Sequence, residues 1–151
     1  MTFHFNDGGR VAAGFTGKRD AGDCAARAIA IATGKPYQEV YAELFRRGRE
    51  YWGQVYISAP KTVARQASPR GGVLDDIYGP YLEDLGWQWV STFKRVGLPC
   101  EVHLRANELP SGRLIARVSR HLVAVIDGVI HDTYDPSNNG TRSVYGYWRQ
   151  Q

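Results

Sequence analysis

The strongest constraint on the fold is an Asp-Gly pair that separates two apolar runs near the C-terminus. Asp127 and Gly128 stand between His121–Ile126 and Val129–Tyr134, two runs rich in β-branched and aromatic residues. Such a pair favours a two-residue hairpin turn, because both residues tolerate the positive φ angles that the turn requires. We therefore expect two antiparallel strands whose register the turn determines.

This register predicts which side chains of the hairpin share a face. A two-residue turn pairs Ile126 with Val129 and, counting away from the turn, Val123 with Asp132. Paired residues share a face, as do residues two apart on one strand, so His121 and Asp132 should point to the same side. The backbone positions of such diagonal neighbours on paired strands lie roughly 7–8 Å apart. A carboxylate there could orient the imidazole of His121 and stabilise its protonated form.

Helical signals dominate the first half of the chain. Residues 23–34 are rich in alanine, with Asp23 as the expected N-cap and Gly34 as the expected C-terminal stop. A second helix is expected over Tyr37–Arg47, because its apolar residues recur with helical spacing, and Gly48 should end it.

The middle of the chain is less regular. Residues 49–72 contain several turn signals and allow a short helix around 61–67. A third helix is expected over 74–85, although Gly79 and Pro80 interrupt its pattern and could split it. Further strands are expected at Trp87–Thr92, Arg113–Val118 and Ser143–Trp148.

These elements predict one domain of the α+β class. The chain has 151 residues, a usual size for a single domain. Residues 1–22 are rich in glycine and lack a period, so we expect an irregular N-terminal arm. Helices in the N-terminal half should pack on an antiparallel sheet built from the C-terminal half.

Composition and charge exclude several classes of protein. Hydrophobic residues make up 43% and charged residues 23%, which is typical of globular rather than disordered chains. No apolar run approaches the roughly 18 residues of a membrane span, and Met1–Arg10 lacks the apolar core of a signal peptide, so we expect a cytoplasmic protein without membrane partners. The 19 basic and 15 acidic residues leave only a mild positive excess. The basic residues are scattered, and the densest group, 46–49, is expected at a solvated helix end, so nucleic acid is not favoured as a partner.

Cys24 is the more informative of the two cysteines. Neither Cys24 nor Cys100 belongs to a metal-binding or redox pair, so we expect two free thiols and neither a metal ion nor another cofactor. Cys24 falls in the first turn of the alanine-rich helix, where free N–H groups and the helix dipole favour a thiolate. A small buried residue among alanines is the structural alternative. With His121 and Asp132, Cys24 would form the set of nucleophile, base and orienting group that nucleophilic catalysis uses.

Three other residues near this set have alternative interpretations. His131 falls on the opposite face of the hairpin and is expected to be structural or exposed. Asp135 is a second choice for the orienting carboxylate, although Asp135-Pro136-Ser137 is typical of a turn. Arg27 lies one turn after Cys24, where it could support the thiolate, but a buried bridge to an acidic residue is the favoured interpretation.

The motifs around these residues resemble those of papain-like cysteine peptidases. The closest resemblance is to compact bacterial domains that process bacteriocin leaders. Their catalytic helix begins with a motif similar to Asp23-Cys24-Ala25-Ala26, and their histidine strand is similar to the strand that begins with His121-Leu122-Val123. Residues 23–34 and 144–148 also look like parts of uncharacterised small phage and bacterial proteins. The resemblance implies a central helix headed by Cys24, packed on an antiparallel sheet that carries His121 and an Asn or Asp.

One position departs from the papain-like pattern. That family usually places a glutamine five or six residues before the cysteine, where its amide helps to form the oxyanion hole. Here Lys18 and Arg19 occupy these places, followed by Asp20. Lys18 could substitute as a cation, with Asp20 as a further candidate, while the backbone N–H of Cys24 supplies one donor.

These observations predict a cysteine hydrolase, peptidase-like or amidase-like, that cleaves an amide bond of a peptide or protein substrate through a thioester; acyl transfer would use the same residues. The alternative is a catalytically degenerate papain-like protein that binds and modulates a protein partner. That partner would be a host protein, met in the host cytoplasm, if a phage encodes the chain. The altered oxyanion positions and the basic stretch 46–70 motivate this alternative.

Overall fold

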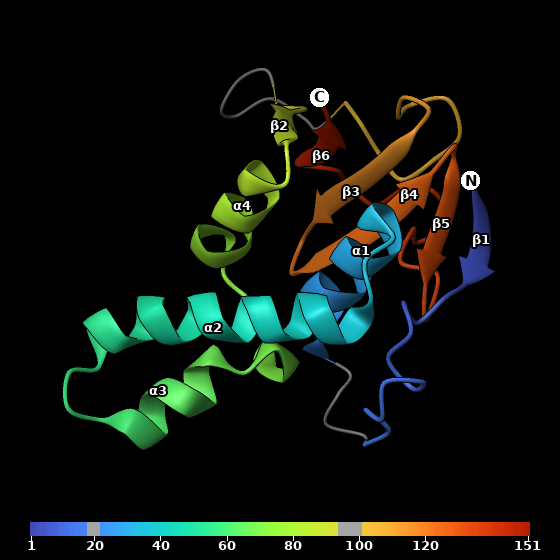
Figure 1. Cartoon of the computed structure of the whole chain (residues 1–151). Coiled ribbons are helices and arrows are strands. Elements are labelled where there is room, and N and C mark those ends of the chain that lie inside the picture. The colour runs from blue at the N-terminus through green and yellow to red at the C-terminus, as the bar shows by residue number, and fades with distance from the viewer. Residues whose placement is uncertain (18–21, 94–100) are drawn as a thin grey trace.

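The computed structural model describes residues 1–17, 22–93 and 101–151. In this part of the chain, four α-helices and a short 3-10 helix lie beside a six-stranded sheet (Figure 1). The helices are α1 (Cys24–Thr33), α2 (Tyr37–Val55), α3 (Pro60–Ala67), η2 (Pro69–Gly71, the 3-10 helix) and α4 (Asp75–Asp84). The strands are β1 (Thr2–Phe5), β2 (Trp87–Ser91), β3 (Arg113–Val118), β4 (His121–Ile126), β5 (Val129–Asp132) and β6 (Gly146–Gln150). The fold is therefore α+β, as expected.

The sheet is mixed rather than antiparallel throughout. Its strand order is β1-β5-β4-β3-β6-β2, and β1 runs parallel to β5 while the other neighbours are antiparallel. The prediction of an irregular arm over 1–22 is wrong at its start, because Thr2–Phe5 forms strand β1. All four residues of β1 are exposed, so the strand lacks the alternation of buried and exposed residues that reveals a strand in a sequence.

Helix α1 forms the centre of the larger core. Its residues from Ala25 to Ala32 are all buried, and it packs across β4 and β3 (Figure 1). Small alanine side chains let the helix approach the sheet closely, where Leu122 and Ala124 meet it. Gly34 ends the helix in the left-handed conformation, with φ 75°, as the sequence predicts.

The opposite face of the sheet carries a second apolar cluster. Val123 and Val125 alternate with the residues that face α1 and pack here against Leu104 and Val144. Strand β4 is thus buried on both faces, whereas half-buried and buried residues alternate along β5. Such burial holds β4 and β5 in one register, because a slip by one residue would exchange the two sets of side chains.

Helix α2 is longer than the sequence predicts. It continues through Gly48 to Val55, and α3 returns alongside it (Figure 1). A Cβ atom on Gly48 would lie 3.1 Å from the Cα and backbone oxygen of Ala67, so the glycine serves the close approach of α3 rather than the end of a helix. Arg46 and Arg47 therefore lie within α2 instead of at a helix end, and both pair with Glu43.

Helix α4 is also continuous. The expected interruption at Gly79 and Pro80 does not occur, and both residues lie within the helix. The short helix expected around 61–67 is present as α3. No helix in the described ranges is both long enough and apolar enough to cross a membrane.

Candidate active site

Cys24 is the first residue of α1. The preceding residue, Asp23, is the N-cap of the helix, as the sequence predicts, but its side chain forms no capping hydrogen bond. Its carboxylate is fully buried and instead accepts hydrogen bonds from Arg27 and from the Tyr37 hydroxyl, the latter at 2.6 Å. The first N–H groups of α1 thus have no side-chain cap from Asp23, and they favour negative charge on Cys24.

His121 and Asp132 meet at the open end of the hairpin. His121 is the first residue of β4 and Asp132 is the last residue of β5. The observed pairs, from Ile126 with Val129 to Ala124 with His131, have the predicted register. His121 Nε2 lies 2.6 Å from Asp132 Oδ2, and both side chains are buried. The diagonal contact expected from the sequence is therefore present in the structure.

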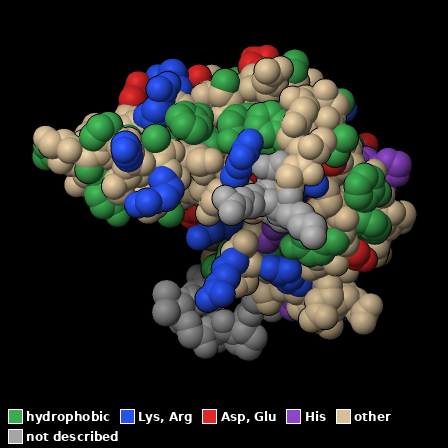
Figure 2. Space-filling model, turned by 90° about the horizontal axis from the view of Figure 1, so that it is seen from below, with side chains coloured by type: hydrophobic (Ala, Val, Ile, Leu, Met, Phe, Trp, Pro, Cys, Tyr) green, Lys and Arg blue, Asp and Glu red, His purple; other side chains and the backbone are tan. Residues whose placement is uncertain are grey.

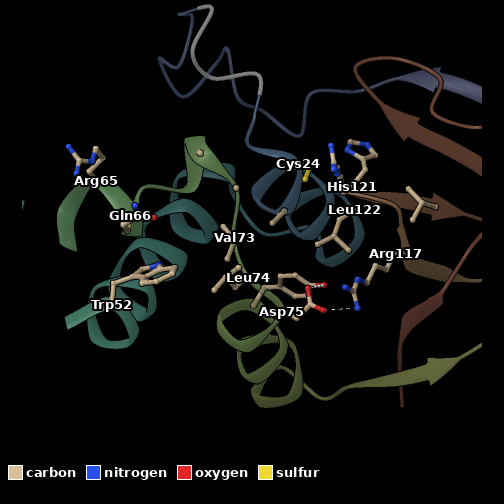
Figure 3. Close-up of a pocket in the computed structure, with 16 residues that line it drawn as sticks. Cys24, Trp52, Arg65, Gln66, Val73, Leu74, Asp75, Arg117, His121 and Leu122 are labelled. Carbon is tan, nitrogen blue, oxygen red and sulfur yellow. Dashed lines mark hydrogen bonds and ion pairs between the residues drawn. The ribbon is translucent and has the colours of Figure 1, made fainter. Parts of the chain in front are cut away.

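The side chains of Cys24 and His121 lie side by side in the cleft (Figure 3), and the imidazole interacts with the thiol closely enough to lower the pKa of the thiol. Since Nε2 of His121 is held by Asp132, Nδ1 is the ring nitrogen that remains for the sulfur. Burial raises the pKa of Cys24, but hydrogen bonds from His121 and from the Leu122 N–H, with the positive charges of His121 and Arg27, outweigh it and lower the pKa below its usual value.

The pKa of His121 moves in the opposite direction. Burial lowers it, but the hydrogen bonds to Asp132 and Cys24 and their negative charges raise the pKa to about 9. A lowered thiol pKa beside a raised imidazole pKa favours a thiolate–imidazolium pair at neutral pH.

A buried ion network holds Asp132 in place. Arg27 Nη2 lies 3.2 Å from Asp132 Oδ1, and the Thr133 N–H donates to the same oxygen at 2.7 Å. Arg27 also pairs with Asp23, which accepts a further bond from Arg10 at 3.1 Å. Arg27 is only 3% exposed, so the favoured interpretation of this residue, a buried bridge to acidic partners, is confirmed. The network ties the start of α1 to the end of β5.

The sulfur and the imidazole open into a cleft of about 610 Å³. Cys24, Ala25, His121 and Leu122 form one side of it, and the segment from α3 to α4 forms the other (Figure 3). Residues of three kinds line the cleft beyond the reactive pair: the arginines Arg65, Arg117 and Arg120, the aromatic residues Trp52 and Tyr78, and the η2–α4 segment Gly71–Asp75. The stretch 49–72, irregular in the sequence, thus contributes a wall of the candidate site.

Two other residues considered in the sequence analysis, Asp135 and His131, lie away from the reactive pair. Asp135 is exposed and accepts the Ser137 N–H at 2.9 Å, in the turn expected there, so it does not replace Asp132. His131 contacts Asn6 and the ring of His4, away from Cys24. Lys18 and Asp20, the oxyanion candidates, and Cys100 lie outside the described residues.

Sequence reasoning missed two features of the site. The ring of Tyr134 lies 5.3 Å from that of His121, two residues after Asp132 and beyond the end of β5. Arg120, immediately before His121, lines the cleft. The sequence shows that Arg120 adjoins His121 and that Tyr134 is close to Asp132. It does not show where these two side chains point, because that depends on the turns before β4 and after β5.

Comparisons with known proteins leave the site to be interpreted from its geometry. Neither protein-family models, curated proteins nor solved structures match this chain. Among the described residues, no three or more histidine, cysteine or acidic side chains gather in a way that could hold a metal ion.

Proposed function

We propose that the protein is a cysteine hydrolase of papain-like type that cleaves an amide bond of a peptide or protein. The observation that carries this proposal is the chain of contacts from the Cys24 thiol through His121 to Asp132 at the edge of an open cleft. A thiol, a base and a carboxylate in this order provide a nucleophile, a proton carrier and a group that orients the carrier.

In the first half-reaction, the thiolate of Cys24 attacks the amide carbonyl carbon. A C–S bond forms, and the carbonyl electron pair moves to oxygen. The backbone N–H of Cys24 at the start of α1 is a donor for that oxyanion. When the C–N bond breaks, the imidazolium of His121 gives its proton to the leaving nitrogen, so the amine departs and an acyl thioester remains.

In the second half-reaction, neutral His121 takes a proton from water as the water oxygen attacks the thioester. The C–S bond breaks, the acid product leaves, and the thiolate–imidazolium pair is restored. Asp132 accepts a hydrogen bond from Nε2 throughout and keeps the ring oriented towards the sulfur. An amine that replaced water in this step would give acyl transfer, with the same roles for the three residues.

The buried ion network supports this chemistry. Arg27 neutralises part of the negative charge on Asp132 and Asp23. Its charge thereby offsets part of the free-energy cost of burying two carboxylates. Because Asp132 is held by Arg27 and by the Thr133 N–H, the carboxylate has a defined direction when His121 binds it. Such fixed partners are typical of sites in which one group must orient another.

The test is cleavage of a peptide library derived from a proteome, followed by mass spectrometry of new amino termini. Wild-type protein should generate cleavages that both Cys24→Ala and His121→Ala lose. Asp135→Asn is the matched control, because this exposed carboxylate should leave cleavage unchanged. Equal products from wild type and Cys24→Ala, or no products from any of them, would contradict the proposal; the second result favours a binding protein with a degenerate site.

A further inference from the structure

Three arginines line the cleft that holds Cys24, and only one of them is neutralised. Arg117 Nη1 lies 2.6 Å from Asp75 Oδ2, and both residues belong to the cleft lining. Within the described residues, Arg65 and Arg120 form no ion pair, and both side chains are exposed. Figure 2 shows Lys and Arg side chains gathered on this side of the molecule, around a recess in which a histidine is visible.

The two unpaired arginines flank the cleft from different elements. Arg120 immediately precedes His121 in the β3–β4 turn, so its guanidinium belongs to the sheet side of the cleft. Arg65 lies on α3, on the opposite wall, as Figure 3 shows. A substrate bound in the cleft therefore lies near two uncompensated positive charges, which attract an anionic group and repel a cationic one.

The backbone at Arg120 gives an independent reason to assign it a role. Arg120 has a φ of 57°, the left-handed region that glycine, asparagine and aspartate adopt more readily than arginine. It occupies the second place of a two-residue turn, since Val118 pairs with His121. The turn itself requires a positive φ, but an arginine in a place that suits glycine or asparagine, beside the reacting groups, is consistent with a role for its side chain in contacting substrate.

We propose, on the basis of the function proposed above, that the cleft selects acidic peptide segments. Arg120 binds a side-chain carboxylate next to the scissile amide, and Arg65 binds a further acidic residue across the cleft. Guanidinium groups suit this task because they bind carboxylates through two parallel hydrogen bonds.

The first experiment compares two alkylating reagents on Cys24. Iodoacetate and iodoacetamide both alkylate the thiolate: a C–S bond forms at the CH₂ carbon of the reagent as iodide leaves. Only iodoacetate carries a carboxylate. Rates are measured by peptide mass mapping, which separates Cys24 from Cys100. The ratio of the iodoacetate rate to the iodoacetamide rate should fall about three- to tenfold in Arg120→Gly and in Arg65→Gln. It should also fall with added salt, because the arginines are exposed.

Arg149→Gln is the matched control, since Arg149 is an exposed arginine outside the cleft and its replacement by glutamine removes the same charge. Its ratio should equal that of wild type. An unchanged ratio in Arg120→Gly and Arg65→Gln, or an equal fall in Arg149→Gln, would overturn the proposal. Slow labelling of Cys24 by iodoacetamide itself would count against the hydrolase and not against anion selection, so the two failures are distinguishable.

The second experiment tests which carboxylate is bound. Three acetylated, amidated peptides differ only in carrying Glu, Gln or Lys at their variable positions, and a fourth has the Gln sequence with a free C-terminal carboxylate. Each is tested for protection of Cys24 from iodoacetamide. The Glu peptide should protect at the lowest concentration and the Lys peptide at the highest, and Arg120→Gly should remove the preference. Equal protection by the Glu peptide and the fourth peptide would contradict recognition of a side-chain carboxylate.

Discussion

The Nε2 atom of His121 lies 2.6 Å from Oδ2 of Asp132, so the two ends of the hairpin meet in one buried contact. This contact directs the other ring nitrogen to Cys24 at the start of α1. Burial lowers the pKa of His121, but this contact and the interaction with Cys24 together raise it to about 9. The proposed chemistry depends on this arrangement, because an imidazolium held beside the thiol favours the thiolate.

Replacing Asp132 by asparagine should lower the pKa of His121 from about 9 towards its ordinary value of 6.5, since a negative partner is lost. If the protein is a hydrolase, cleavage should also fall roughly 10²–10⁴-fold. The pKa is measured by NMR titration of the His121 ring. Asp135→Asn is the control and should change neither quantity; an unaltered His121 pKa in Asp132→Asn would show that the contact does not hold the charge.

Removing Arg27 should destabilise the fold strongly. Arg27→Met leaves Asp23 and Asp132 buried without their shared cation, and breaking a buried pair in this way costs about 3–5 kcal/mol. Unfolding in urea, followed by circular dichroism, measures the loss. Arg46→Met is the comparison, because Arg46 pairs with Glu43 and Glu50 in solvent and its loss should leave the unfolding midpoint close to that of wild type. Similar midpoints for both variants would contradict a structural role for the buried network.

The His121–Asp132 pair should make stability depend on pH. A group whose folded pKa is raised stabilises the protein below its unfolded pKa, and this contribution is lost as pH rises through the folded pKa. Cys24→Ser removes the thiol, whose lowered pKa acts in the opposite sense. The free energy of unfolding of Cys24→Ser should exceed that of Cys24→Ser/His121→Gln most at pH below 6.5, and the excess should shrink towards pH 9. A constant excess across this range would show that His121 is not held in its charged form.

Local patterns in the sequence predict the part of the site that the hairpin builds. The turn at Asp127 and Gly128 determines the register, and the register is sufficient to place His121 beside Asp132. The start of α1 at Cys24, with Asp23 as the N-cap residue, also follows from local signals, although the Asp23 side chain forms no capping hydrogen bond. The carboxylate of Asp23 pairs with Arg27 instead, because a buried cation binds it more strongly than neutral backbone N–H groups do.

Long-range packing accounts for what the sequence does not reveal. Strand β1 pairs in parallel with β5, a contact between segments more than a hundred residues apart that no local pattern encodes. Gly48 suggested a helix end because glycine often follows a helix, yet its role is to let Ala67 of α3 approach α2. Arg65 and the η2 segment form one wall of the cleft because α3 packs closely against α2. This wall could not be predicted from the sequence, since the packing of α3 on α2 is a long-range contact.

Two glycines of α2 should therefore respond to alanine with opposite signs. A Cβ on Gly48 would lie 3.1 Å from the backbone of Ala67, whereas a Cβ on Gly53 would meet nothing within 4 Å. Gly53→Ala should stabilise the protein by up to about 1 kcal/mol, the usual gain in helix propensity. Gly48→Ala should destabilise it, because α3 must shift. Thermal unfolding measures both variants, and an equal gain from the two would show that α2 and α3 do not pack as closely as described.

The pH dependence of Cys24 alkylation by iodoacetamide is the most direct test of the thiolate–imidazolium pair. In wild-type protein the rate should rise with an inflection well below the ordinary thiol pKa of about 8.5, since His121, the Leu122 N–H and Arg27 together lower the pKa of Cys24. In His121→Gln the inflection should move upwards. An inflection at or above the ordinary value in wild type, or the same inflection in both proteins, would contradict the pairing of Cys24 with His121.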